Sequence, residues 1–330
     1  MRKSAFAVIA VALVASSAAV TFASAATSSK TVGPVSLAFS KGASSVVSCA
    51  GAVPRSEPAG TRMSISVSLG AYGATLKGSV VNDFDGNLRM DSPSMTLSYD
   101  GKAGDTYQLL DEPGSWYDGG LGFTTKTWSS PGSIPGSVLC LARFDRNPDV
   151  QVLVPLFEPG QCCTFDNLFE IYDFANSGSS DAIGAANLGE VGGTLVDEHG
   201  VALLLGIDPR FTGAFSDYVG TSWPLRVYTL DDLGLIDVTR QWPSLIERDA
   251  GSDLERFDQL LHHGKPQDTR GLLAAWAADE CEIGRCSQAL TFVSQKLAAG
   301  DAAPFEGSAT TYLALLRHDL IAWGYVPDTT

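Results

Sequence analysis

The stretch Asp-Val-Thr-Arg-Gln-Trp-Pro at residues 237–243 separates two parts of the chain that have different sequence patterns. Before it, short apolar runs alternate with turns rich in glycine, serine and aspartate, which is typical of β-structure. After it, apolar residues recur at intervals of three and four, as on one face of a helix. The pattern predicts a β-rich region over residues 26–240, either undivided or divided near residue 130, followed by an α-helical unit over residues 241–330.

Upstream of this boundary, the sequence contains several strand signals. Apolar and polar residues alternate over Met63–Leu69, which predicts a strand with one face buried. Val150–Phe157 and Val201–Ile207 are nearly continuous apolar runs, so we expect these strands to be buried on both faces. Further strands are expected at Val35–Phe39, Met95–Tyr99, Val138–Phe144, Leu168–Phe174 and Leu225–Leu230.

Downstream of the boundary, the spacing of apolar residues predicts four helices. A capping box at Ser252–Glu255 predicts the start of the first helix, and Gly264 with Pro266 its end. The other three are expected around Leu272–Trp276, Leu290–Leu297 and Tyr312–Trp323, with Gly300 and Gly324 ending the last two.

Residues 1–25 have the features of an export signal. Arg2 and Lys3 precede the apolar segment Ala5–Phe22, and Ala23-Ser24-Ala25 is a small-residue cleavage site. The alternative is a membrane anchor, but the apolar stretch is of marginal length and contains serine and threonine. We therefore expect a secreted, extracellular protein with no stable membrane insertion once the leader is removed.

The overall charge restricts the class of partner. The 22 basic and 37 acidic residues give a formal net charge of −15, which excludes a nucleic-acid footprint and argues against anionic lipid. Hydrophobic residues make up 45% of the chain, a proportion that is typical of globular proteins and not of disordered ones.

Six cysteines would enter an oxidising compartment with the exported chain. Cys281 and Cys286 flank a turn between two expected helices, which predicts a disulfide between them. Cys162 and Cys163 are adjacent, and their Cα atoms, about 3.8 Å apart, are too close for an ordinary disulfide. We expect one of the two to pair with Cys140 and the other with Cys49. A metal–thiolate site is the alternative, but no two cysteines have the two-residue spacing typical of one.

One acidic loop has the spacing of a calcium site. Asp83, Asp85, Asn87 and Asp91 occupy positions 1, 3, 5 and 9 of a loop that would place oxygen ligands around Ca²⁺. Leu88 stands at position 6, where glycine usually allows the sharp turn. The alternative is a hairpin turn built on Asp85-Gly86, which needs no ion. No other cofactor is expected.

Two short strings combine an acid with an arginine. Asp208 and Arg210 follow the expected strand Val201–Ile207, while Asp237 and Arg240 lie in the boundary stretch. In each string the charged pair can clamp a turn through charge-assisted hydrogen bonds, or it can orient a ligand. The clamp is the interpretation that we favour.

Several segments together point to a family. They are residues 144–149 (Phe-Asp-Arg-Asn-Pro-Asp) leading into Val150–Phe157, residues 160–163 (Gly-Gln-Cys-Cys), 208–211 (Asp-Pro-Arg-Phe), 237–243, and 273–279 (Leu-Ala-Ala-Trp-Ala-Ala-Asp). Through them the chain, from about Val138 to Tyr325, resembles secreted bacterial proteins related to the VCBS/FG-GAP repeat (integrin-α N-terminal-like) proteins, a group largely of unknown function. Gln161 stands where these relatives carry a histidine.

This resemblance implies propeller-like β-blades. The expected fold class is therefore a β-rich domain, propeller-like or sandwich, followed by an α-helical unit. The helical part also resembles half of a tetratricopeptide repeat, with Ala289 following Gly284 at the helical turn. Because one repeat cannot form a solenoid, a capping helical hairpin is expected.

The sequence contains none of the usual hydrolase or phosphate-binding motifs: no Gly-x-Ser-x-Gly, no His-Glu-x-x-His and no phosphate-binding glycine loop. The expected function is that of a secreted, disulfide-stabilised, non-catalytic binding or surface-associated protein with an extracellular or cell-surface ligand. The alternative is an exported hydrolase with an acid-based active site that contains Asp208 and Asp237. No catalytic residue is assigned from sequence.

Overall fold

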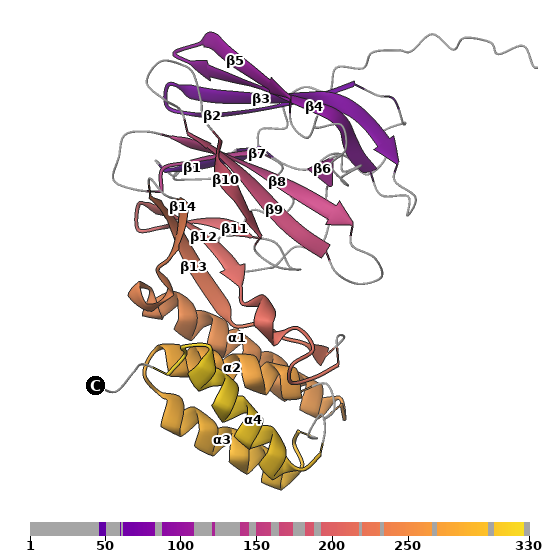
Figure 1. The fold of residues 1–330 in the computed structure, drawn as a ribbon, viewed down its shortest axis with the longest axis vertical. Coiled ribbons are helices and arrows are strands. Elements are labelled where there is room, and N and C mark those ends of the chain that lie inside the picture. Colours follow the sequence, from indigo (N-terminus) through magenta and orange to yellow (C-terminus); the bar gives the residue numbers. More distant parts are fainter. Residues whose placement is uncertain are drawn as a thin grey trace, which may run out of the picture.

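The computed structural model describes residues 46–50, 60, 62–82, 88–108, 121–122, 139–144, 150–159, 165–173, 182–187, 193–217, 220–231, 234–265, 269–302 and 307–326. Its strands form three antiparallel sheets, and four helices follow them (Figure 1). The predicted division into a β-rich region and a C-terminal helical unit is therefore confirmed. The predicted leader, the strand at residues 35–39 and the loop at residues 83–87 lie outside the described residues.

The three sheets are named here by their position. The N-terminal sheet contains β2 (Arg62–Leu69), β3 (Tyr72–Asn82), β4 (Leu88–Tyr99), β5 (Lys102–Gln108) and β6 (Leu121–Gly122). The middle sheet has the order β1 (Val47–Ala50), β7 (Leu139–Ala142), β8 (Gln151–Pro159), β9 (Phe165–Asp173) and β10 (Ala182–Asn187). The junction sheet consists of β11 (Thr194–Glu198), β12 (Val201–Ile207), β13 (Leu225–Asp231) and β14 (Gly234–Asp237).

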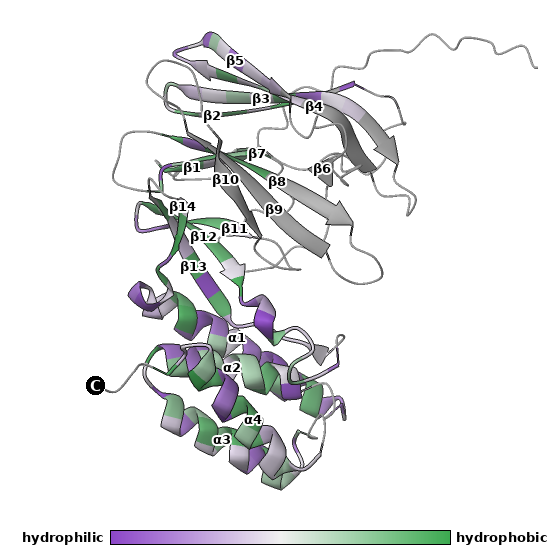
Figure 2. Cartoon of the chain, in the orientation of Figure 1, coloured by the Kyte–Doolittle hydropathy of each residue, from purple (hydrophilic) through white to green (hydrophobic). Residues whose placement is uncertain are grey.

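The junction sheet is covered on both faces. Ala202 and Leu204 of β12 pack in one apolar cluster with residues of the middle sheet, among them Leu153. Leu203 and Leu205 point to the opposite face, where they pack with Val227, Val238 and Leu245. This arrangement explains why β12 is a nearly continuous apolar run, as predicted, and why the sheet is mostly hydrophobic in Figure 2.

The described strands are stacked in layers. The middle and junction sheets share an apolar core, as in a sandwich, and the helices lie beyond the junction sheet (Figure 1). No propeller arrangement of blades is seen among the described strands. In β2 the predicted alternation is confirmed, because Ile65, Val67 and Leu69 are buried while Ser66 and Ser68 are exposed.

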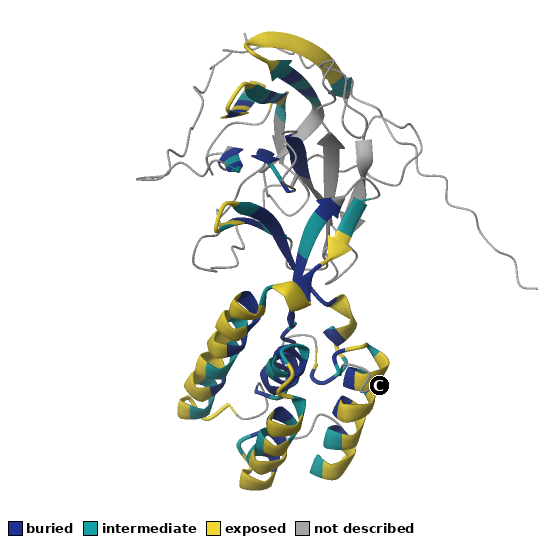
Figure 3. Ribbon diagram, turned by 90° about the vertical axis from the view of Figure 1, so that its left-hand side faces the viewer, coloured by how far each residue is buried: buried dark blue, intermediate teal, exposed yellow. Residues whose placement is uncertain are grey.

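The helical unit consists of α1 (Pro243–His262), α2 (Arg270–Glu282), α3 (Cys286–Ala299) and α4 (Ala309–Ala322). Their outward faces are exposed and their inward faces buried, as Figure 3 shows, around a core that includes Phe211, Phe257 and Leu316. Gly264, Gly300 and Gly324 follow the ends of α1, α3 and α4 with positive φ angles, which confirms the predicted ends. Among the described helices, none is long and apolar enough to cross a membrane.

The predicted start of α1 was wrong. The helix begins at Pro243, so Ser252 and Glu255 lie in its interior and cap nothing. Proline suits the first helical position, because its fixed φ angle is helical and its missing N–H would have no partner there. A capping-box pattern inside a longer amphipathic helix cannot be told from a true start by local sequence.

Two disulfides are present in the described residues. The predicted bond between Cys281 and Cys286 is confirmed, and it joins the end of α2 to the start of α3. The predicted pairing of Cys162 and Cys163 with Cys140 and Cys49 was wrong in both parts, because Cys140 is bonded to Cys49. These two residues face each other across the antiparallel pair β1–β7, and strand pairing brought them together across 91 residues of sequence. Cys162 and Cys163 lie outside the described residues.

Replacing Gly271 with alanine is expected to lower the free energy of unfolding by about 1–3 kcal/mol. Gly271 lies in α2 against the segment before β13, and a Cβ atom there would lie 2.1 Å from the carbonyl oxygen of Gly220. One of the two backbones must move, which outweighs the gain of about 1 kcal/mol that alanine normally brings to a helix. Urea denaturation of the variant measures the effect.

Gly251→Ala is the matched control, because this glycine also lies within a helix but has open space where its Cβ would be. Alanine should stabilise the protein there by up to about 1 kcal/mol. Equal stability of the two variants would contradict the close approach of α2 to Gly220.

Candidate functional site

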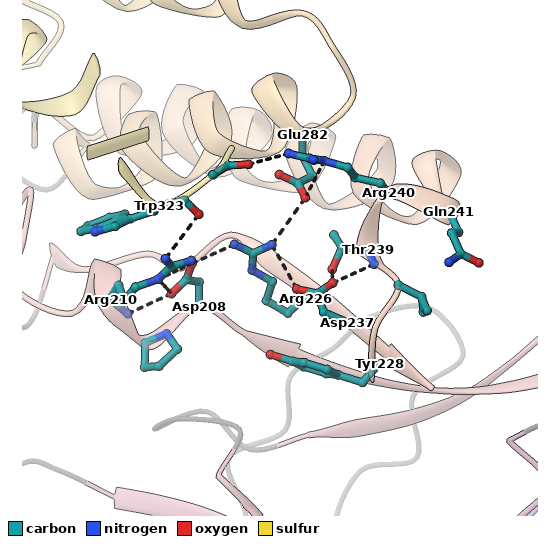
Figure 4. Close-up of a pocket in the computed structure, with 13 residues that line it drawn as sticks. Asp208, Arg210, Arg226, Tyr228, Asp237, Thr239, Arg240, Gln241, Glu282 and Trp323 are labelled. Atoms are coloured by element: carbon teal, nitrogen blue, oxygen red, sulfur yellow. Dashed lines mark hydrogen bonds and ion pairs between the residues drawn. The ribbon is translucent and has the colours of Figure 1, made fainter. Parts of the chain in front are cut away.

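A pocket of about 610 Å³ lies where the junction sheet meets the helical unit (Figure 4). Five segments that are distant in sequence contribute its charged and aromatic side chains. The lining residues are Asp208, Pro209, Arg210, Arg226, Tyr228, Asp237, Val238, Thr239, Arg240, Gln241, Glu282, Trp323 and Gly324. We call this site the junction pocket.

Most of these residues stand at the ends of elements. Asp208 follows β12 and caps the short 3₁₀ turn Pro209–Phe211, with its carboxylate accepting from the backbone N–H of Arg210. A second 3₁₀ turn, Thr239–Gln241, follows β14 and leads into α1. Glu282 is the last residue of α2. Because these ends converge, polar side chains from separate layers reach one another.

The carboxylate of Asp208 is at the base of the site. Its side chain is only 3% exposed, and it accepts hydrogen bonds from Nε of Arg210 at 2.8 Å, from Nη2 of Arg226 at 3.0 Å and from the hydroxyl of Tyr325 at 2.7 Å. Burial alone would raise the pKa of Asp208. The hydrogen bonds from Arg210 and Tyr325 and the charge of Arg226 outweigh it, and they lower the pKa to about 2.

Arg226 connects the acids of the pocket. Its side chain is 9% exposed, and besides Asp208 it bonds through Nη1 to Asp237 at 3.3 Å and to Glu282 at 3.5 Å. Its guanidinium carbon also lies 4.5 Å from the ring centre of Tyr325. Three carboxylates thus neutralise an arginine that would otherwise be a costly buried charge.

Arg210 and Arg240 hold the end of α4. Nη1 of Arg210 donates to the carbonyl oxygen of Trp323 at 3.3 Å, and Nη2 of Arg240 donates to that of Gly324. These carbonyls belong to the C-terminal end of the helix, where a positive charge is favourable. Arg210 also lies over the indole ring of Trp323 at 5.3 Å, and Nε of Arg240 pairs with Glu282 at 3.4 Å.

The structure brings both predicted acid–arginine strings into one pocket. Asp208 contacts Arg210 directly, as the clamp interpretation expects. Asp237 instead accepts from the backbone and hydroxyl of Thr239 and from Arg226, while Arg240 bonds to Glu282 and Gly324. The second string therefore does not form an internal clamp.

Sequence reasoning missed three members of this network: Arg226, Glu282 and Tyr325. One signal for Arg226 was available, because it is a charged residue inside the otherwise apolar run Leu225–Leu230. A buried charge must be paired, so this position by itself implied a partner. No comparable signal marks Glu282 or Tyr325.

The predicted calcium ligands fall largely on residues that the structure does not describe. Asp91 lies on β4 opposite Ser79, and its companions Asp83, Asp85 and Asn87 lie outside the described residues. Within the part of the chain that the structure describes, no group of three or more histidine, cysteine or acidic side chains is placed to hold a metal ion.

Comparison with known proteins adds no assignment: the chain matches no family model, no curated protein and no solved structure. The resemblance to VCBS/FG-GAP-related proteins and to a tetratricopeptide repeat therefore stays a prediction. A functional proposal has to rest on the chemistry of the junction pocket.

Proposed function

We propose that this protein is a secreted, non-catalytic binding protein whose ligand occupies the junction pocket. One observation carries the proposal: two half-exposed guanidinium groups, on Arg210 and Arg240, line an open cavity. Each is paired with a buried acid, Arg210 with Asp208 and Arg240 with Glu282. The two arginine side chains are 43% and 49% exposed, whereas those of Asp208 and Glu282 are 3% and 6% exposed. The accessible charged groups of the pocket are therefore Arg210 and Arg240, with Asp237 beside them.

The two arginines are held in place before any ligand arrives. Asp208 fixes Arg210 through Nε, and Glu282 with the carbonyl of Gly324 fixes Arg240. A guanidinium has five N–H donors, so both groups retain donors beyond these contacts. Nη1 of Arg240 makes no bond to any described residue. Side chains ordered in advance lose less entropy on binding, which favours affinity.

The chemistry of the lining favours a small organic anion. Guanidinium groups pair with carboxylate or phosphate through two parallel hydrogen bonds. Asp237, 47% exposed, offers an acceptor for a hydroxyl or amine of the same ligand, and Trp323 an aromatic surface. A cavity of about 610 Å³ suits a molecule of the size of a sugar acid or an amino acid.

A binding role also accounts for the acids better than hydrolysis does. A general acid or base needs a pKa near the working pH and an accessible oxygen. Asp208 is buried, its carboxylate is occupied by Arg210, Arg226 and Tyr325, and its pKa is about 2. Because the Asp208 carboxylate is occupied by these partners, it is not available as one of the two acids that the hydrolase alternative needs.

Titration calorimetry with galacturonate, glutamate and inorganic phosphate tests this proposal, with galactose as the neutral comparison. At least one anion should bind to the wild type, and galactose should bind far more weakly. In Arg240→Gln the affinity should fall by about 10- to 100-fold, because one charge-assisted pair is lost.

Arg248→Gln is the matched control. This arginine of α1 is 42% exposed and pairs with Glu198, away from the pocket residues, so its loss should leave the affinity unchanged. If none of the anions binds, or if the Arg240 and Arg248 variants bind equally well, the junction pocket is not an anion site.

A further inference from the structure

Three carboxyl groups meet between α1, α2 and the start of β13, outside the junction pocket. Asp249 and Asp253 lie one turn apart on α1, and Asp279 lies on the facing helix α2. The carboxyl groups of Asp249 and Asp279 are within hydrogen-bonding reach of each other. We call these three residues the carboxyl cluster.

Asp249 and Asp253 are half-buried and reach solvent, but Asp279 is fully buried and has fewer donors than its oxygens need. The backbone N–H of Leu225 donates to Oδ1 of Asp279 at 3.2 Å, and the hydroxyl of Ser222 donates to Asp253 at 3.3 Å. Oδ2 of Asp279 is buried and has no donor among the described residues, and the residue as a whole is 1% exposed. An orphaned buried oxygen of this kind requires an explanation.

A proton provides that explanation. A hydrogen bond between two carboxyl groups exists only if one of them is protonated, because two carboxylates have no donor between them. A metal ion is the other means of neutralising such a cluster, but no metal-holding group of acids is found in the described residues.

The positively charged groups around the cluster are too few and too exposed to neutralise it in place of a proton. From α1, Arg248 and Arg256 exert an attraction on Asp249 and Asp253, but both arginines are exposed. From beyond α4, Tyr325 faces Asp279, and its raised pKa keeps it neutral. From the segment entering β13 come only the neutral donors of Ser222 and Leu225.

We propose that the carboxyl cluster is a proton-dependent lock that holds the helical unit on the junction sheet. When protonated, it joins α1 to α2 by a carboxyl–carboxyl hydrogen bond and α2 to β13 through Leu225. When ionised, its like charges repel one another at the same interface, and the helices are held less tightly. The lock does not depend on the pocket having a ligand.

The direction of the pH effect follows from linkage. Burial raises the pKa of Asp249 to about 6, and burial with the neighbouring carboxylates raises the pKa of Asp253 and Asp279 well above their ordinary value of 3.8. At any pH between the ordinary pKa of 3.8 and these raised pKa values, the folded state holds more protons than the unfolded state. Stability therefore falls as pH rises from about 4 through 6 and beyond.

Urea denaturation of the wild type and of Asp279→Asn, from about pH 5 to about pH 8, tests the lock. The wild type should lose stability as pH rises. The variant carries a neutral amide of the same shape, so it should lose most of this pH dependence and be more stable than the wild type at pH 8. Asp258→Asn, at an exposed position on α1, should behave as the wild type does.

Three results would overturn the lock. The first is wild-type stability that stays level or rises over this range. The second is a pH dependence of Asp279→Asn as steep as that of the wild type. The third is stabilisation of the wild type by Ca²⁺ that the variant lacks, which would mean that a cation neutralises the cluster.

If Asp279→Asn does not fold, the infrared band of protonated carboxyl groups in the wild type gives a direct reading. The proposal expects this band at about pH 6.5, where exposed carboxyl groups are ionised. Its absence at that pH would refute the lock without any variant.

Discussion

Asp208→Ala should lower the free energy of unfolding by about 3–5 kcal/mol. The substitution removes the acceptor for Arg210, Arg226 and Tyr325 in one step. Most of the loss comes from Arg226, which stays at 9% exposure with its best partner gone. Tyr325, buried and deprived of its acceptor, adds to the loss. Urea denaturation near neutral pH measures the change.

Asp237→Ala is the control for this prediction. Asp237 touches the same arginine, but it is 47% exposed, and Arg226 keeps Asp208 and Glu282 when it is lost. Its loss should therefore cost about 1–2 kcal/mol, mainly through its hydrogen bonds to Thr239. A small effect for Asp208→Ala, equal to that for Asp237→Ala, would mean that the buried network contributes nothing beyond an ordinary surface pair.

The same residue gives stability a second, opposite pH dependence. Because the pKa of Asp208 is lowered to about 2 in the folded state, its contribution is fully present above its ordinary pKa of 3.8. It is lost as pH falls from about 4 towards 2, where the carboxylate is protonated. With the carboxyl cluster acting in the other direction, these groups together place maximal stability at about pH 4, with a decline on either side.

The double variant Cys49→Ala/Cys140→Ala should lose about 4–5 kcal/mol in the oxidised protein. This bond spans 91 residues, so it restricts the unfolded chain strongly. Cys281→Ala/Cys286→Ala removes a bond that spans only 5 residues, and about 2 kcal/mol is expected. Unfolding of both variants without reductant measures the difference.

Peptide mapping without reduction checks the pairing itself. It should recover one peptide pair that joins Cys49 to Cys140 and one that joins Cys281 to Cys286. Recovery of Cys140 linked to Cys162 or Cys163 would restore the pairing that the sequence suggested and would contradict the strand register of β1 and β7.

The elements that sequence predicted well depend on local physics. The burial of Val201–Ile207 on both faces follows from an unbroken apolar run, and the helix ends at Gly300 and Gly324 follow from the ease with which glycine adopts a positive φ. The bond between Cys281 and Cys286 is equally local, because a short turn keeps the two thiols together. In each case the determining residues are close in sequence.

The predictions that were wrong depended on contacts between residues that are distant in sequence. Ser252 and Glu255 satisfied a capping pattern, but the continuation of the helix back to Pro243 depended on Leu245 packing under the junction sheet. Cys140 paired with Cys49 because two strands are neighbours, a choice that no spacing rule expresses.

By itself, the sequence determined that a β-rich part precedes a helical one, the boundary near residue 240 and the chemical types of the candidate residues, because periodicity and turn chemistry act over a few residues. It did not predict every strand: β3 and β5, for example, have no counterpart among the expected strands. Tertiary structure alone decided that Asp208 would meet Arg226, 18 residues away, and Tyr325, 117 residues away. It likewise brought Asp279 to Asp249. Such meetings arise when layers pack, and local patterns contain no information about which distant side chains a shared interface will bury together.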